Sequence, residues 1–281
     1  MSGGVDSSVA ALLLKEAGHE VVGVTMCFSA QERRKKRPSC CGLEGIEDAR
    51  RVAGQLGIPH YVLSFGASLK KSVISDFVRE YTHGRTPNPC VRCNQYLKFD
   101  ALLKKAKGLG MDYLATGHYA RISKRGGAFY LKKGVDPKKD QSYFLCQIDP
   151  SHLSRLLFPL GDLTKEEVRA IAKKRGLIVA DKPGSQEVCF IPDDDYRAFL
   201  KEQLGPSFSK PGDIVDREGR VLGRHQGILN YTIGQREGLG ISSDKRLYVT
   251  RLDVRKNIVV VGPREGVFSP GLVAEEPNIF V

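Results

Sequence analysis

The first 150 residues alternate between helical and strand-like spacing of hydrophobic positions. An apolar helical pattern from Val9 to Leu14 ends at Gly18, and the largely apolar run that follows, EVVGVTM, predicts a buried strand. Further helices are predicted over 45–57, 69–81 and 96–109, and further strands over 60–63 and 111–116. This alternation indicates an α/β fold, a Rossmann-like parallel sheet with helices on both faces, which binds ligands at the carboxyl ends of its strands.

The pattern changes after Pro150. The stretch TKEEVRAIAKKRGL predicts a helix that opens with a capping box of Thr164 and Glu167, and PDDDYRAFLKEQLG predicts a second short helix. From about Pro211, strands and turns are predicted in GDIVDREGRVLG, HQGILNYTIGQ and RLYVTRLDVRKNIVVVG, a pattern typical of a small β-barrel. We therefore predict three domains: the α/β domain over 1–150, a small helical domain over 151–210 and an incomplete β-barrel over 211–281.

Charge and cysteine content narrow the class of protein. The formal net charge is +12, which favours an anionic partner and nucleic acid first. Seven cysteines form an odd count in a chain too long to need disulfide stapling, so thiol chemistry or metal binding is expected rather than a secreted disulfide framework. The sequence shows neither a membrane-length apolar span nor a secretory signal, and we expect a cytoplasmic protein with no membrane partner.

The opening segment SGGVDSS has the chemistry of a phosphate-binding loop. Gly3 and Gly4 let the backbone approach a ligand, and the helix that follows offers unsatisfied N–H groups and a partial positive charge. The loop has no lysine to reach a transferred phosphate, which separates it from the GxxxxGK[ST] pattern. The alternative is an ordinary helix start capped by Asp6 or Ser7.

Cysteines supply the second candidate site. The segment TPNPCVRCN carries Cys90 and Cys93, and Cys189 lies far along the chain. The prolines before Cys90 predict a stiff, non-helical loop that presents a thiolate to solvent. The alternatives are inert thiols or a structural zinc site, which would need a fourth ligand such as Cys40 or Cys41.

These segments resemble known enzymes. SGGVDSS resembles the pyrophosphate loop of the N-type ATP pyrophosphatases, which split ATP between its α- and β-phosphates and adenylate a carbonyl oxygen. The chain as a whole resembles the tRNA-specific 2-thiouridylases, which replace the C2 oxygen of the wobble uridine with sulfur. The matching segments are SGGVDSS, CCGLEGIEDARRVAGQLGIPHYVL, TPNPCVRCN, YLATGHYAR, KDQSYFL, SQEVCFI and GQREGLG. The resemblance implies an adenine nucleotide hydrolase-like α/β domain followed by a helical domain and a barrel.

The resemblance also implies roles for individual residues. It makes Cys93 the catalytic nucleophile and Cys189 the persulfide carrier, with a disulfide between the two left after turnover. It places ATP, with Mg²⁺ on Asp6, at the residues Ser2, Gly3, Gly4, Val5, Asp6, Ser7, Ser8, Met26 and Gly117. It places tRNA contacts at Asn88, Pro89, Cys90, His118, Lys139, Asp140 and Gln141.

Two features depart from the family pattern. The family resemblance implies NPD in most relatives where this chain has NPC, so Cys90 replaces an aspartate that could act as a general base. The set Cys90, Cys93 and Cys189 resembles instead the cluster-dependent tRNA thiolases, in which three thiolates hold a 4Fe–4S cluster and one iron binds sulfide. Both sulfur routes are compatible with the sequence. The family's barrel also continues past Val281, and only Met1 precedes the loop where a strand is expected, so we expect the chain to be clipped at both ends.

The implied reaction is ATP-dependent 2-thiolation of the wobble uridine, by adenylation of its C2 oxygen and sulfur transfer. The implied partners are the anticodon stem-loop of tRNA and a sulfur source, either a persulfide-carrying protein in a cysteine desulfurase relay or sulfide. Two alternatives are a nitrogen-transferring ATP pyrophosphatase ligase, which has no use for a thiol pair, and a non-catalytic RNA-binding zinc protein. Pyrophosphate release from ATP separates the enzymes from the zinc protein.

Overall fold

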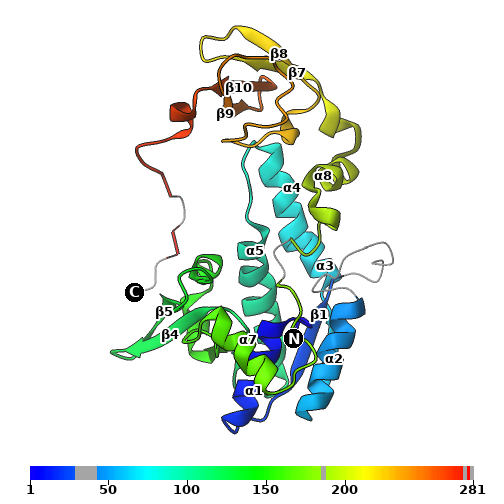
Figure 1. The fold of residues 1–281 in the computed structure, drawn as a ribbon, viewed down its shortest axis with the longest axis vertical. Helices are drawn as coiled ribbons and strands as arrows, with labels where there is room; N and C mark the ends of the chain where they lie inside the picture. The colour runs from blue at the N-terminus through cyan, green and yellow to red at the C-terminus, as the bar shows by residue number, and fades with distance from the viewer. Residues whose placement is uncertain (29–42, 185–187, 275–276, 279–281) are drawn as a thin grey trace. The chain divides into compact units, whose positions relative to one another are not determined.

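The computed structural model describes residues 1–28, 43–184, 188–274 and 277–278. The chain forms two compact units, shown in Figure 1. Unit 1 comprises Met1–Val73, Pro89–Asp193 and Asn278–Val281, and unit 2 comprises Ile74–Asn88 and Asp194–Pro277. In the described part of the chain, the helices are too short or too polar to cross a lipid bilayer. The three-domain division at residues 150 and 210 stays a prediction.

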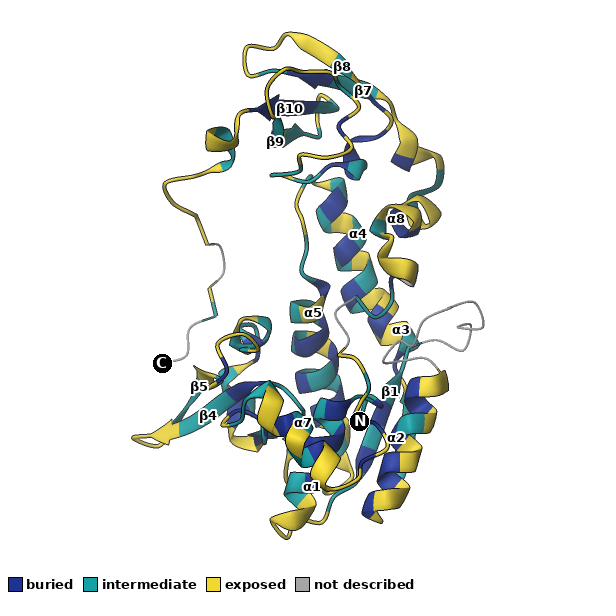
Figure 2. Ribbon diagram, in the orientation of Figure 1, coloured by how far each residue is buried: buried dark blue, intermediate teal, exposed yellow. Residues whose placement is uncertain are grey.

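Unit 1 begins with the predicted alternation of helices and parallel strands. Helix α1 (Val5–Glu16) leads to strand β1 (Gly23–Cys27), and helix α2 (Leu43–Leu56) leads to strand β2 (His60–Ser64). Strands β1 and β2 pair in parallel, with Gly23 opposite His60, which confirms the α/β prediction for this part of the chain. Helix α2 is amphipathic, which explains why this segment packs as a helix against the sheet (Figure 2). Its buried apolar face consists of Ile46, Ala49, Val52, Ala53 and Leu56, and polar residues line the other face.

Two longer helices contain π-helical turns. The first runs through α3 (Gly66–Leu69), a π segment (Lys70–Ile74) and α4 (Ser75–Thr82). The second runs through α5 (Pro89–Arg92), a π segment (Cys93–Leu102) and α6 (Leu103–Gly108). The second helix therefore starts seven residues before the predicted start at Tyr96. Proline is well tolerated in the first turn of a helix because the missing N–H has no partner there.

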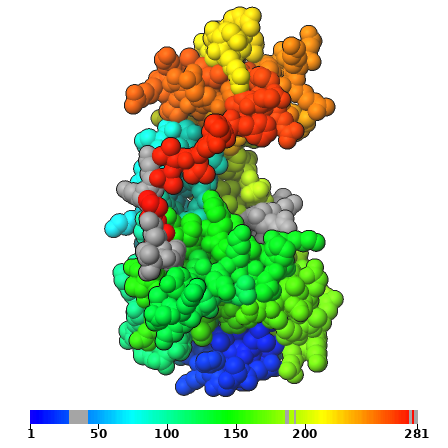
Figure 3. Space-filling model, turned by 90° about the vertical axis from the view of Figure 1, so that its left-hand side faces the viewer, coloured from blue at the N-terminus to red at the C-terminus, as the bar shows by residue number. Residues whose placement is uncertain are grey.

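The rest of unit 1 adds short strands and one further helix. Strand β3 (Leu114–Ala115) pairs in parallel with β6 (Leu156–Leu157), and β4 (Ala120–Arg125) forms an antiparallel hairpin with β5 (Ala128–Lys133). The hairpin and the turns that follow it form much of the surface of unit 1 in Figure 3. Helix α7 (Lys165–Lys174) starts with the predicted capping box of Thr164 and Glu167 and packs against α1 through Val168 and Ala172.

Unit 2 contains a four-stranded sheet in the order β8-β7-β10-β9. Its strands are β7 (Gly212–Val215), β8 (Val221–His225), β9 (Tyr248–Asp253) and β10 (Ile258–Gly262), and β7 and β10 are parallel. The predicted strand in HQGILNYTIGQ is wrong, because β8 ends at His225 and a 3-10 turn (Ile228–Asn230) follows. Helix α8 (Tyr196–Leu204) belongs to this unit, as does α4, and Tyr81 stacks on Tyr196 at 5.2 Å between ring centroids.

The remaining short 3-10 helices are Ser142–Leu145, Pro150–Arg155, Pro192–Asp194, Gly205–Ser209 and Arg264–Val267.

Candidate functional site

The loop before α1 is built for close backbone packing. Gly3 has φ +72°, and a Cβ atom there would lie 2.2 Å from the carbonyl oxygen of Gly45 on α2. Only glycine fits that conformation and that space. The hydroxyls fold back on the loop: Ser7 Oγ accepts from the N–H of Ser2 at 3.0 Å, and Ser8 Oγ donates to the Gly4 carbonyl at 2.9 Å.

The amino end of α1 carries no capping side chain. Its N-cap residue is Gly4, so the alternative of a cap by Asp6 or Ser7 is wrong. The first turn of a helix has N–H groups that lack partners within the helix, and the helix dipole makes this end favourable for anions. The loop and helix start therefore provide what a phosphate group requires.

Of the two predicted ATP contacts outside the loop, Gly117 packs directly on it. A Cβ atom on Gly117 would lie 2.8 Å from the carbonyl carbon of Asp6 and 2.9 Å from the Ser7 nitrogen. Met26 is half-buried near the carboxyl end of β1. That end of a parallel strand is where α/β folds bind ligands.

Asp6 is the centre of a polar cluster that sequence reasoning missed. Its Oδ1 atom accepts from the Tyr119 hydroxyl at 2.8 Å and from the Lys165 ammonium group at 2.5 Å. Lys165 Nζ also lies 5.8 Å from the centroid of the Tyr119 ring. Burial and the nearby Asp6 carboxylate raise the pKa of Tyr119, so its hydroxyl stays protonated and acts as a donor.

Lys165 is held in place from its backbone. Its N–H donates to Asp136 Oδ2 at 3.0 Å, and Asp136 is buried. The Lys138 N–H donates to the other oxygen of the same carboxylate at 2.9 Å. These hydrogen bonds hold the pKa of Asp136 below its usual value, and the bond from the Lys165 N–H has the largest effect. The first turn of α7 is therefore tied to the segment of Asp136 within unit 1, and the Lys165 side chain is 14% exposed.

Two of the predicted tRNA contacts shape the loop that supports Tyr119. Gln141 exchanges two hydrogen bonds with the Tyr119 backbone, at 2.9 and 3.0 Å. Asp140 accepts from the Gly134 N–H at 2.9 Å and from the Ser142 hydroxyl at 2.8 Å. Their side chains therefore organise the segment, whereas Lys139 beside them is exposed.

His118 lies among aromatic rings. Its ring centroid is 5.8 Å from that of Phe99 and 6.0 Å from that of Phe158, and its Nδ1 lies 2.7 Å from Thr116 Oγ1. Burial lowers the pKa of His118 well below its ordinary value, with the Lys98 charge adding to the effect. The imidazole is neutral near pH 7 and does not offer RNA a positive charge.

The cysteine segment differs from the predicted stiff loop. Cys90 lies in the first turn of α5 and is exposed, but Cys93 begins the π segment and is buried with 9% exposure. The prediction of a non-helical loop with an exposed thiolate is wrong for Cys93, because Pro89 starts a helix whose next turn faces the core. Neighbouring Asn94 is 2% exposed and donates to the Phe144 carbonyl at 2.9 Å, which ties TPNPCVRCN to KDQSYFL.

Cys189 is half-buried and lies just after residues 185–187, which are outside the described part of the chain. The described residues include Cys90, Cys93 and Cys189, and they contain no group of three His, Cys, Asp or Glu side chains placed to hold a metal ion. The three thiols as arranged here therefore do not fit a cluster site. Cys40 and Cys41, considered as a fourth zinc ligand, lie outside the described residues.

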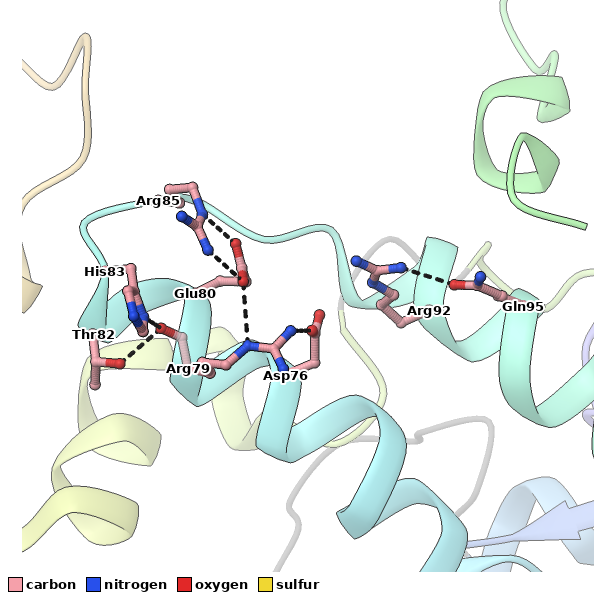
Figure 4. Close-up of polar contacts among 8 residues, drawn as sticks. All are labelled: Asp76, Arg79, Glu80, Thr82, His83, Arg85, Arg92 and Gln95. Atoms are coloured by element: carbon pink, nitrogen blue, oxygen red, sulfur yellow. Dashed lines mark hydrogen bonds and ion pairs between the residues drawn. The ribbon is translucent and has the colours of Figure 1, made fainter. Parts of the chain in front are cut away.

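Basic side chains flank the segment of Asn88 and Pro89. In unit 2, the Arg85 guanidinium binds both oxygens of Glu80, and Arg79 pairs with Asp76 and Glu80 (Figure 4). The side chains of Arg79 and Arg85 are 60% and 61% exposed, so they reach solvent despite these pairs. In unit 1, the Arg92 guanidinium donates to Gln95 at 2.9 Å. Asn88 is half-buried and Pro89 is buried.

Two family models match consecutive parts of the chain. The family described as "tRNA methyl transferase HUP domain" matches residues 1–193, and the family described as "tRNA methyl transferase PRC-barrel domain" matches residues 197–263.

Curated relatives cover nearly the whole chain. The tRNA-specific 2-thiouridylase MnmA 1 of Syntrophus aciditrophicus is 57% identical over 278 residues, which are 99% of this chain and 74% of that protein. The tRNA-specific 2-thiouridylase MnmA of Geotalea uraniireducens is 55% identical over 285 residues, with 99% and 76% covered. A solved structure of NMN synthetase from Francisella tularensis matches with TM-score 0.40 and 18% identity, over 70% of this chain and 69% of that one, a likeness too slight to carry an argument.

Proposed function

Since this chain belongs to the tRNA-specific 2-thiouridylase family, it is an ATP-dependent tRNA-uridine 2-sulfurtransferase, and we propose that its Gly3–Ser8 loop binds the nucleotide phosphates during activation of the uridine. The single observation that carries this proposal is the uncapped amino end of α1 at Gly4, framed by Gly117. The two alternatives from the sequence, a nitrogen-transferring ligase and a non-catalytic zinc protein, do not agree with the relatives.

Activation overcomes a poor leaving group. The C2 oxygen of uridine belongs to a delocalised carbonyl, so sulfur cannot displace it directly. We propose that this oxygen attacks the α-phosphorus of ATP, forming a C2 O-adenylate and releasing pyrophosphate. Sulfur then attacks C2, and AMP leaves with the former C2 oxygen. N–H groups at the start of α1 would stabilise the negative charge that develops on the phosphates.

A magnesium ion would fit this site through Asp6. Carboxylate oxygen is the ligand that Mg²⁺ takes from proteins when it also binds substrate phosphates. Among the residues that the structure describes, Tyr119 and Lys165 both donate to Asp6 Oδ1. When bound, the ion would neutralise phosphate charge, while Tyr119 and Gly117 hold the Asp6 residue in position.

For the sulfur step we propose a thiol route, with the roles that the family resemblance gives to Cys93 and Cys189. The terminal sulfur of a persulfide on Cys189 attacks C2 and displaces AMP, which leaves C2 joined to Cys189 through a disulfide. The Cys93 thiolate then attacks the Cys189 sulfur. The products are the 2-thiouridine and a Cys93–Cys189 disulfide, which an external dithiol reduces before a sulfur donor reloads Cys189.

The competing route uses a 4Fe–4S cluster on Cys90, Cys93 and Cys189. The arrangement of the described residues counts against it, because they include these three cysteines but no group of three ligands placed for a metal ion. The presence of three cysteines in the sequence remains the observation in its favour. The two routes differ in a measurable way, since only the second needs iron.

We propose that tRNA binds through its phosphates to exposed basic side chains, among them Arg79 and Arg85 in unit 2 and Lys139 in unit 1. The target base in the anticodon loop is already weakly paired, so it can turn out of the stack at modest cost. The neutral His118 would contribute shape or hydrogen bonding rather than charge.

The test uses anaerobically purified protein, a tRNA transcript and Mg·ATP. Iron is measured first, and thiolation is then measured with a persulfide donor or with sulfide. Iron-free protein that forms 2-thiouridine from the persulfide donor supports the thiol route. Protein that contains about four irons and thiolates only when they are present contradicts it.

A further inference from the structure

The pyrophosphate loop contains no lysine, yet the structure brings one to it from far along the chain. Lys165 lies 159 residues after Asp6, and its ammonium nitrogen is 2.5 Å from Asp6 Oδ1. The two elements that carry these residues, α1 and α7, pack together through Val9, Val168 and Ala172 in one hydrophobic cluster. The core of unit 1 therefore fixes the backbones of the two helices that carry Asp6 and Lys165.

We propose that Lys165 is a phosphate-binding residue of this enzyme, which pairs with Asp6 in the nucleotide-free loop and moves to the β- and γ-phosphates when Mg·ATP binds. The proposal rests on the proposed function of the loop and adds a residue to it. On this proposal, Lys165 binds the β- and γ-phosphates, which are the part of ATP that leaves as pyrophosphate.

Charge supports the exchange. A nucleotide that approaches the amino end of α1 meets the negative Asp6, and repulsion between the carboxylate and the phosphates must be offset. Lys165 already neutralises Asp6, from a position that is 14% exposed. A cation that binds Asp6 would repel the ammonium group, and phosphate oxygens would be the nearest new partners. Lysine binds phosphate as a compact point charge on a flexible stem, which suits a group that changes partners.

The surroundings of Lys165 allow the side chain to move while its backbone stays in place. Asp136 and the Thr164 capping box fix the backbone at the start of α7. Tyr119 donates to the same Asp6 oxygen at 2.8 Å, so Asp6 keeps one orienting hydrogen bond after Lys165 leaves. The exchange then requires only rotation about side-chain bonds of Lys165.

The reaction explains why the lysine would serve the β- and γ-phosphates. The uridine oxygen must reach the α-phosphorus in line with the departing pyrophosphate. A cation on the leaving group stabilises the charge that develops there in the transition state. Lys165 should therefore strengthen binding of ATP and pyrophosphate and contribute little to binding of AMP.

The test is equilibrium binding of ATP, pyrophosphate and AMP, each with Mg²⁺, to the full chain by calorimetry. Lys165→Gln is the variant, and Lys173→Gln is the matched control, because Lys173 lies on the same helix, is 62% exposed and pairs with Asp181. Loss of a charge-assisted contact predicts about 10- to 100-fold weaker binding of ATP and pyrophosphate to Lys165→Gln. AMP binding should stay within about twofold, Lys165→Arg should recover part of the loss, and Lys173→Gln should behave like the wild type.

Two results would contradict the role of Lys165 but leave the proposed function of the loop intact. Unchanged ATP and pyrophosphate affinity in Lys165→Gln would show that Lys165 does not reach the phosphates. Equal weakening of ATP and AMP would show that Lys165 only maintains the loop structure. A wild-type chain that binds neither ATP nor pyrophosphate would instead contradict the proposed function of the loop, and the inference with it.

Discussion

Gly117 lies so close to Asp6 that a Cβ atom on Gly117 would be 2.8 Å from the Asp6 carbonyl carbon. The contact joins the segment before Tyr119 to the Gly3–Ser8 loop through backbone atoms, which cannot rotate away as a side chain could. The position of Asp6 therefore depends on a residue 111 positions further along the chain having no side chain.

Gly117→Ala should move the loop away from its present position. A methyl group forced into packed backbone destabilises a fold by about 1–3 kcal/mol, and the ATP affinity should fall with the displaced loop. Urea unfolding and ATP binding measure the two effects. Gly108→Ala is the control, because a Cβ atom on that helical glycine meets nothing within 4 Å. A Gly117→Ala variant as stable and as tight for ATP as Gly108→Ala would contradict the packing argument.

Thr164→Ala should weaken both α7 and the nucleotide site. Thr164 Oγ1 accepts from the Glu167 N–H, and removal of such a cap costs about 1 kcal/mol. Because the next residue is Lys165, loss of the cap should also lower the affinity for ATP relative to AMP. Thermal unfolding and calorimetry measure these changes. Thr164→Ser, which keeps the hydroxyl, should retain both properties, and equal ATP binding by the Ala and Ser variants would argue against coupling of the helix start to the site.

Stability should fall with decreasing pH below about 6.5, the ordinary pKa of histidine. The pKa values of His60, His118 and His225 are lowered by burial in the folded state. Above the unfolded pKa all three are neutral in both states and contribute nothing to the pH dependence. Below it the unfolded chain binds protons that the folded chain does not, so unfolding is favoured until the folded pKa is reached.

Urea unfolding across pH 5 to 8 measures this dependence. His118→Phe keeps an aromatic ring between Phe99 and Phe158 and should show a shallower fall in stability toward pH 5 than the wild type. A wild-type stability that is flat or rises as the pH falls from 6.5 would contradict the lowered pKa values of these three histidines in the folded chain.

Cys90→Asp distinguishes the two sulfur routes. The substitution introduces the aspartate that the family resemblance implies at this position and removes a proposed cluster ligand, while leaving Cys93 and Cys189 in place. On the thiol route, the rate of thiolation from a persulfide donor should stay within about tenfold of the wild-type rate. The new aspartate can act as a general base, which can raise or lower that rate. Cys93→Ser should abolish thiolation but still convert ATP to AMP. Loss of thiolation in Cys90→Asp together with loss of iron would favour the cluster route.

RNA affinity should fall steeply with salt if the exposed arginines bind phosphates. The logarithm of the binding constant falls linearly with the logarithm of the salt concentration, and each counterion released from the RNA makes this slope steeper. The affinity of an interface with six or more phosphate contacts therefore falls by about a thousandfold between 50 and 200 mM salt. Arg85→Gln should reduce the slope by about one, because Arg85 is 61% exposed at the edge of the cluster in Figure 4. Filter binding of a tRNA transcript at several salt concentrations measures both, and a flat salt profile would contradict the electrostatic interface.

Local sequence patterns predicted those features that depend on neighbouring residues. The alternation that forms β1 and β2, the capping box at Thr164 and the strands β9 and β10 each follow from residues a few positions apart. The glycine loop followed by a helix at Val5 was also predicted, because glycines and a following helix are local signals, whereas phosphate binding by this loop stays a prediction.

Long-range contacts explain what the sequence did not reveal. No local signal indicates that Lys165 contacts Asp6, because α7 reaches α1 only through the packing of unit 1. The helical start at Pro89 and the burial of Cys93 likewise depend on how the helix packs, which overrides the loop preference of the two prolines. In HQGILNYTIGQ, alternation of apolar residues predicted a strand, but Gly227 takes φ +147° and a 3-10 turn follows.

The most direct test of the account is product analysis of one turnover with α-labelled ATP, a tRNA transcript and a persulfide donor. The account predicts that AMP, pyrophosphate and 2-thiouridine form in equal amounts and that none forms without tRNA. Formation of ADP and phosphate, or of 2-thiouridine without consumption of ATP, would contradict the central claim that adenylation of the uridine oxygen makes it replaceable by sulfur.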